Sequence, residues 1–115
     1  MSVSIDDVRA AAQAIEGQVV RTPIVRSGAL SDGLGCDVFL KLETLQRTGS
    51  FKDRGALVKL QGLSEDGARR GVCAVSGGHH ARGVAAHGQR LGVGWAGLVG
   101  VGARVAGGGR GAACG

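Results

Sequence analysis

The fold is decided by residues 72–80, which read Val72-Cys73-Ala74-Val75-Ser76-Gly77-Gly78-His79-His80. Four apolar residues in a row predict a short buried strand. Two glycines follow, and the residues from about His79 to Leu91 have the spacing of a helix. A strand that leads through a glycine loop into a helix is typical of an α/β domain.

The same order of elements occurs once before in the chain. Residues 38–42 are nearly all apolar and predict a buried strand, while Ser50 is a good N-cap for a helix over about 51–61 that Gly62 ends. Two such units in succession predict a parallel sheet with flanking helices, joined by right-handed crossovers. Ligands of such sheets bind at the C-terminal ends of the strands, where both loops fall.

The first 35 residues predict one helix followed by extended and turn-rich chain. Ser4 and Asp7 have the spacing of a capping box, apolar residues recur at helical spacing after them, and Gly17 is placed to end the helix. Pro23 keeps the residue before it out of the helical region. Residues 27–35 are rich in turn formers and predict a turn.

Composition excludes several classes of protein. The chain has 115 residues, enough for one compact domain, and 23 of them are Gly. A single Pro and no G-X-Y period exclude collagen. There is no run of about 18 apolar residues, the acidic N-terminus is unlike a signal peptide, and three scattered cysteines form neither a disulfide framework nor a zinc pair. We therefore expect a cytoplasmic protein without a membrane partner.

Positive charge is concentrated in the second half of the chain. Of the net charge of +5, residues 1–66 contribute −1, and residues 67–115, with six arginines and no acid, contribute +6. These arginines are spread thinly among Gly and Ala beside one aromatic residue, Trp95. Because nucleic-acid sites need a denser basic footprint, we expect no nucleic-acid partner. A small basic binding module stays open as an alternative.

Residues 94–115 differ in composition from the rest of the chain. They contain nine Gly in 22 positions and no acid, amide or hydroxyl side chain. Glycine loses the most backbone entropy on ordering, and few large side chains offset that loss. We expect residues 1–93 to form the domain and 94–115 to be a tail with little regular structure and few buried side chains. All its residue types have GC-rich codons, which fits an out-of-frame origin.

The strongest chemical signal is Thr48-Gly49-Ser50-Phe51-Lys52-Asp53-Arg54-Gly55. A lysine in the first turn of a helix faces the positive end of the macrodipole, and partial burial would also disfavour its ammonium form. A neutral lysine amine is a nucleophile toward aldehydes and can act as a base. By spacing alone, Lys52 is equally read as a solvated helix residue, and Asp53 and Arg54 as surface charges.

The loop at residues 76–80 carries the second signal. The free N–H groups at the start of a helix bind anions such as carboxylate or phosphate, and glycine allows close approach. Taken alone, such a loop is usually just a tight turn. His79, His80 and His87 lack an evident third ligand, so we expect no metal site.

Residues from about 20 to 93 resemble the N-terminal part of threonine dehydratases (threonine ammonia-lyases), with serine dehydratases and serine racemases as close relatives. These are pyridoxal-phosphate enzymes of fold type II, also called tryptophan-synthase-β-like. The resemblance rests on Arg21-Thr22-Pro23, Val38-Phe39-Leu40-Lys41-Leu42-Glu43, Gln46-Arg47-Thr48-Gly49-Ser50-Phe51-Lys52, Arg54-Gly55-Ala56, Gly71-Val72, Ser76, Gly78, His80-Ala81, Gly83-Val84-Ala85 and Leu91-Gly92.

The resemblance implies a cofactor, pyridoxal 5'-phosphate, and a role for each motif. The lysine of the family's Ser-Phe-Lys motif holds the cofactor as a Schiff base, a role that falls on Lys52, with Phe51 beside the cofactor ring. The family's serine–small–Gly–Asn–His loop binds the substrate carboxylate through its backbone, and its Asn contacts the phenolic oxygen of the cofactor. These roles fall on Ser76, Gly77, Gly78, His79 and His80, with His79 in the place of the Asn.

The implied reaction is β-elimination on a small amino acid, L-threonine or L-serine, in an enzyme family that is usually homo-oligomeric. Lys52 would remove the α-proton, the β-hydroxyl would leave, and hydrolysis would give a 2-oxo acid and ammonia, while the cofactor ring stores the charge. The motifs leave open whether threonine or serine is preferred, and whether the reaction is elimination or racemisation.

The sequence departs from the family pattern in two ways. His79 replaces the Asn, and Arg82 replaces the usual Gln. The resemblance also ends at about Val93, so the glycine-rich phosphate cup and the group facing the pyridine nitrogen have no counterpart here. A catalytically inactive fragment and a serine racemase-like protein are therefore the alternatives to a dehydratase.

Overall fold

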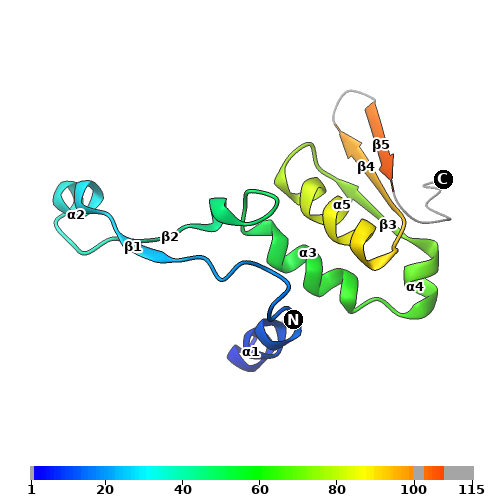
Figure 1. Cartoon of the computed structure of the whole chain (residues 1–115), viewed down its shortest axis with the longest axis horizontal. Helices are drawn as coiled ribbons and strands as arrows, with labels where there is room; N and C mark the ends of the chain where they lie inside the picture. Colours follow the sequence, from blue (N-terminus) through cyan, green and yellow to red (C-terminus); the bar gives the residue numbers. More distant parts are fainter. Residues whose placement is uncertain (1, 100–102, 108–115) are drawn as a thin grey trace.

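The computed structural model describes residues 2–99 and 103–107 (Figure 1). Within them the elements follow in the order α1 (Ile5–Ala14), β1 (Ile24–Arg26), α2 (Gly28–Leu34), β2 (Phe39–Lys41), the 3-10 helix η1 (Glu43–Leu45), α3 (Lys52–Gln61), α4 (Glu65–Arg70), β3 (Val72–Val75), α5 (His79–Leu91), β4 (Trp95–Val99) and β5 (Ala103–Gly107). The helices over 51–61 and 79–91 and the strand 72–75 are confirmed, the first of them beginning one residue late.

The larger sheet has the order β3-β4-β5. Strands β3 and β4 are parallel, with Val72 opposite Trp95, and β5 runs antiparallel to β4. Since β3 and β4 are joined through α5, the predicted α/β architecture with a parallel strand pair is confirmed. Helices cover one face of β3, because Ala74 is buried whereas Val75, on the other face, is 79% exposed.

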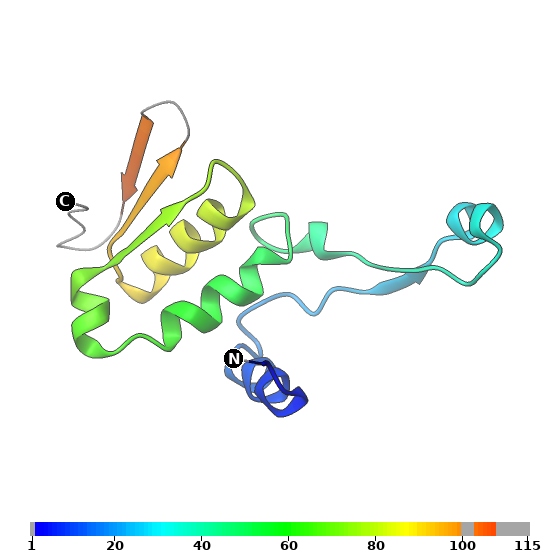
Figure 2. The same ribbon diagram turned by 180° about the vertical axis from the view of Figure 1, so that it is seen from behind.

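The core lies where α3 and α5 meet this sheet. Ala56 of α3, Ala74 of β3 and Val84 of α5 form a buried cluster against which Val72 and Trp95 pack. The two helices run side by side in the same direction, with their N-termini at the same end (Figures 1 and 2). Small residues line their contact, which allows the backbones to come close.

Two expectations for the first 42 residues are wrong. Strand β2 is not a buried member of the parallel sheet: it pairs antiparallel with β1 in a separate two-stranded sheet, all of whose residues are exposed. This ribbon and α2 project away from the core, so no helix covers them (Figure 1). Residues 28–34 form helix α2 rather than a turn, because Ser27 caps its start and Gly35 ends it in the left-handed region.

The N-terminal helix follows its sequence signal. Ser4 caps α1 and makes the predicted capping box with Asp7, which donates its backbone N–H to Ser4 Oγ and accepts from the Ser4 N–H. Hydrogen bonds to Ser4 hold the pKa of the Asp7 carboxyl below its usual value. The predicted stop at Gly17 lies just past the last turn, with φ at +70°.

The tail contains more regular structure than its composition suggests. Residues 95–99 and 103–107 form β4 and β5, so the prediction of little regular structure is wrong for these residues. The edge of β3 offers unpaired backbone N–H and C=O groups, and strand pairing satisfies them whatever the side chains. The burial of Val99, Val101 and Val105 and the structure of 108–115 lie outside what is described. The boundary at residue 93 and the out-of-frame origin stay predictions.

Candidate functional site

Lys52 begins helix α3, directly after a tight loop. Gly49 has a φ of +80°, a conformation that favours glycine, and Ser50 Oγ accepts the Lys52 backbone N–H at 3.2 Å. The lysine side chain is exposed, and its Nζ lies 4.8 Å from the centre of the Phe51 ring, which is also exposed. The expectation of partial burial is therefore wrong, and the amine is accessible to a reactant.

The loop after β3 forms a second part of the site. Ser76 Oγ accepts the Gly78 backbone N–H at 3.2 Å, which closes the turn into α5. Ser76, Gly77 and Gly78 line an open pocket of about 180 Å³ together with Arg82. The first N–H groups of α5 have no partner within the helix, so this pocket combines amide donors with a guanidinium, a set that suits an anion.

The predicted site residues do not all share one hollow. His79 is exposed at the first position of α5. His80 lines a different pocket, of about 230 Å³, between α3, β3 and α5. Lys52 lines neither of these two pockets. The structure thus brings Ser76, Gly77 and Gly78 together but separates His80 from them.

The packing of α3 against α5 places the two parts at the same end of the fold. A Cβ added to Gly83 would lie 3.3 Å from the backbone oxygen of Lys52 and 3.2 Å from the Ala56 Cβ. Gly83 is five residues after Gly78, or about 7.5 Å along a helix. The start of α3 therefore lies within about two turns of the start of α5, as the prediction that both loops share one end of the sheet requires.

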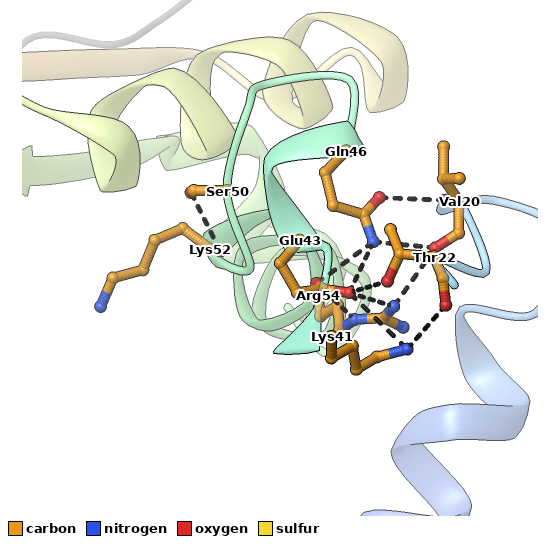
Figure 3. A network of polar contacts seen from close by, with 8 residues as sticks. All are labelled: Val20, Thr22, Lys41, Glu43, Gln46, Ser50, Lys52 and Arg54. Carbon is orange, nitrogen blue, oxygen red and sulfur yellow. Dashed lines mark hydrogen bonds and ion pairs between the residues drawn. The ribbon is translucent and has the colours of Figure 1, made fainter. Parts of the chain in front are cut away.

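A polar network holds the start of α3 on its other side (Figure 3). Arg54 donates to Glu43 through Nε at 2.9 Å and through its NH2 group at 2.8 Å, a bidentate ion pair. The Thr22 hydroxyl and the Gln46 amide also donate to Glu43, and Gln46 exchanges hydrogen bonds with the Val20 backbone at 2.8 and 3.0 Å. Arg54 is therefore not a free surface charge, as its sequence context alone suggested.

This network explains the polar part of the sequence motifs. Thr22, Glu43, Gln46 and Arg54 come from four separate motifs of the family resemblance, and the structure joins them at one point. The Arg54 hydrogen bonds are the main cause that lowers the pKa of Glu43 to about 2, and burial opposes them. The same contacts raise the pKa of Arg54. The Lys52 side chain extends away from the network (Figure 3).

Asp53 is a functional candidate that the sequence did not indicate. It is 1% exposed, although its neighbours in sequence are charged and the motif suggested a surface carboxylate. Its side chain contacts the Thr48 backbone N–H and the ring of His87 on α5. His87, considered above only as a metal ligand, is also buried. Its spacing eight residues after His79 gave no signal of this contact.

Two further features bear on the class of protein. In residues 2–99 and 103–107, no three His, Cys, Asp or Glu side chains lie together as a metal-binding group. No helix in the same part of the chain is long and apolar enough to cross a membrane.

Comparison with known proteins identifies the family. The pattern of the family described as pyridoxal-phosphate dependent enzyme matches residues 15–104, eleven residues beyond Val93, where the motif resemblance was expected to end. This chain belongs to the pyridoxal-phosphate dependent enzyme family. The family resemblance, the fold type II architecture and the cofactor of the family, pyridoxal phosphate, are thereby confirmed.

Individual relatives within this family narrow the likeness. The L-threonine ammonia-lyase of Thermotoga maritima is 43% identical over 91 residues, which are 79% of this chain and 23% of that protein. A solved threonine deaminase, whose source is abbreviated T.th., is 43% identical with a TM-score of 0.73, over 84% of this chain and 30% of that one. Maize serine racemase is 31% identical with a TM-score of 0.78, over 86% and 31%.

The residues at this site fit the family's cofactor in their chemistry. The Lys52 amine is exposed and can meet an aldehyde, and the amide donors and Arg82 at the start of α5 can meet an anionic group. The chain spans 23% to 31% of the relatives' length, so these donors are only a part of what a relative could supply.

Proposed function

We propose that this chain is the lysine-bearing part of an enzyme that removes water and ammonia from L-threonine or L-serine, giving 2-oxobutanoate or pyruvate. The observation that carries the proposal is the exposed Lys52 at the start of α3, packed beside the first turns of α5. The 43% identity to an L-threonine ammonia-lyase supports the reaction class.

Each residue of the site has a defined task in this proposal. The Lys52 amine carries the cofactor, and when released its Nζ takes the α-proton of the amino acid. Ser76, Gly77 and Gly78, with His79 and His80 at the start of α5, bind the substrate carboxylate through backbone N–H groups. Phe51 lies against the cofactor ring. Bound pyridoxal phosphate supplies an electron sink for the charge left at the α-carbon.

Chemical trapping tests the role of Lys52. The chain holds three lysines, Lys41, Lys52 and Lys59. We expect borohydride reduction in the presence of pyridoxal phosphate to label Lys52 in preference to Lys59, an exposed lysine on the same helix, as measured by peptide mass spectrometry. Labelling of both at equal rates would contradict the proposal. Lys52→Ala is the matched control, in which only the background labelling of the other lysines remains.

A racemase is the second candidate, favoured by the likeness to maize serine racemase. Both reactions begin with removal of the α-proton, so product analysis separates them. Incubation of the complete protein with L-serine should give pyruvate if it is a dehydratase and D-serine if it is a racemase. A cytoplasmic location and assembly with further copies of the chain remain proposals from the sequence.

A further inference from the structure

A buried carboxylate joins the loop before Lys52 to α3 and α5. Asp53 follows Lys52 directly and is 1% exposed. Its Oδ2 accepts the Thr48 backbone N–H at 3.1 Å, and its Oδ1 lies 3.0 Å from Nε2 of His87. Because a carboxylate only accepts hydrogen bonds, the His87 ring nitrogen is the donor.

His87 brings α5 into this arrangement. It is 3% exposed and lies eight residues after His79, the first residue of α5. A buried charged or polar group is costly unless its partner is present. Sliding α5 along α3 by one turn would move its start by about 5.4 Å and leave both side chains without each other. The hydrogen bond therefore fixes the register of the two helices.

A second contact acts in the same register. Gly83 lies one helical turn before His87 and approaches the Lys52 backbone oxygen so closely that an added Cβ would be 3.3 Å away. The start of α3 is thus held against α5 by a steric contact at Lys52 and a polar contact at Asp53. The Thr48 hydrogen bond ties the loop with Gly49 and Ser50 to the same carboxylate.

We propose that Asp53 and His87 are positioning residues for Lys52, which set the place of its amine relative to the loop at Ser76–Gly78. This inference rests on the proposed function of Lys52. It assigns to two side chains that touch neither substrate nor cofactor the task of holding both parts of the site in register. Arg54 and Glu43 hold the opposite side of α3 and do not contact α5 through any hydrogen bond described.

The test measures the preference of pyridoxal phosphate trapping for Lys52 over Lys59. We expect Asp53→Ala to lower this preference about tenfold or more, because misplacing a reacting group by about 1 Å can cost two orders of magnitude. Asp53→Asn, which keeps an oxygen and the shape, should retain most of it. Leu57→Ala is the matched control: Leu57 is fully buried in α3, so the change destabilises the helix packing without removing a contact of Asp53.

Two outcomes separate this inference from the function beneath it. Equal labelling of Lys52 and Lys59 in the unmodified chain overturns the proposed function. A clear preference in the unmodified chain that persists in a folded Asp53→Ala variant overturns the positioning role alone. A preference lost equally in Leu57→Ala also overturns it, since loss of stability would then explain the effect.

A second pair of variants covers the case in which Asp53→Ala does not fold. His87→Ala leaves the Thr48 hydrogen bond intact and should still lower the preference, whereas His87→Gln restores a donor and should recover it in part. On the unmodified chain, the Thr48 amide should exchange with solvent at least about tenfold more slowly than in an unstructured peptide, as expected for a protected hydrogen bond. Exchange at the unstructured rate would overturn the proposal without any variant.

Discussion

Glu43 shows how one residue links the motifs to the fold. Its side chain is 15% exposed and accepts hydrogen bonds from Arg54, Thr22 and Gln46, and its carboxylate is the one group they share. A bidentate guanidinium and two neutral donors favour the ionised form, which is why the pKa falls to about 2 against the opposing effect of burial. Replacing this charge leaves Arg54 without its main partner.

The lowered pKa of Glu43 predicts how stability depends on pH. A carboxyl whose pKa is lowered in the folded state stabilises that state above its unfolded pKa of about 4.5, and the contribution is lost as the pH falls from 4.5 to about 2. We expect Glu43→Gln to lower the free energy of unfolding by about 2 kcal/mol at pH 7, as for hydrogen bonds to charged groups. Urea unfolding of both proteins should show this difference shrinking below pH 4.5.

An exposed glutamate provides the control for this measurement. Glu16→Gln should change the free energy of unfolding by less than about 0.5 kcal/mol at any pH, because surface substitutions rarely do more. A difference between Glu43→Gln and the unmodified chain that stays constant from pH 7 to pH 2.5 would contradict the proposed ion pair.

At the scale of elements, local signals predicted those structures whose partners are close in sequence. The capping box of α1, the strand 72–75 and the helices α3 and α5 follow from caps, glycines and apolar spacing within about ten residues. The partner of β2 could not be predicted in this way. Its apolar run is typical of a buried strand, but burial depends on which other elements cover it, and β2 pairs only with β1.

The candidate site divides in the same manner. Lys52 and the loop at 76–78 were predicted because helix starts and glycine turns are local features. The contact of Asp53 with His87 joins residues 34 positions apart, and no local pattern encodes it. Arg54 with Glu43 is a similar case, since a charged pair at a distance in sequence is read as surface charge until the fold joins it.

The close approach of α3 and α5 predicts opposite effects for two glycines. Gly83→Ala should destabilise the chain by about 1 to 3 kcal/mol, because the new Cβ would lie 3.2 Å from the Ala56 Cβ and 3.3 Å from the Lys52 oxygen and push the helices apart. Gly55→Ala, in α3 with no atom within 4 Å of the added Cβ, should stabilise it by about 0.5 to 1 kcal/mol. Thermal unfolding of both variants measures the difference, and destabilisation by both would show that helix propensity and packing were assigned wrongly.

At the scale of the whole molecule, the chain buries little of its apolar surface. Its radius of gyration is 16.9 Å, against about 13 Å for a compact domain of 100 residues. The ribbon of β1 and β2 leaves Phe39 60% exposed, and the outer face of β3 leaves Val75 uncovered. Parallel sheets are normally covered on both faces. The relatives, of which this chain spans 23% to 31%, have further chain that could cover these faces.

This incompleteness determines what the 115-residue chain can do alone. An accessible amine can react reversibly with a free aldehyde, but tight binding of a phosphate group needs several aligned N–H donors. The described residues offer only the pocket at Ser76–Gly78 and Arg82. His79 also places an imidazole where the family resemblance implies an amide beside the phenolic oxygen. We therefore expect weak cofactor affinity and no measurable release of 2-oxobutanoate from L-threonine by the purified chain. A coupled 2-oxo acid assay with added pyridoxal phosphate, run beside Lys52→Ala, measures this. Turnover that is present in the chain and lost in Lys52→Ala would show that residues 1–115 suffice for the reaction, and that the donors at the start of α5 hold the cofactor without the rest of a relative's chain.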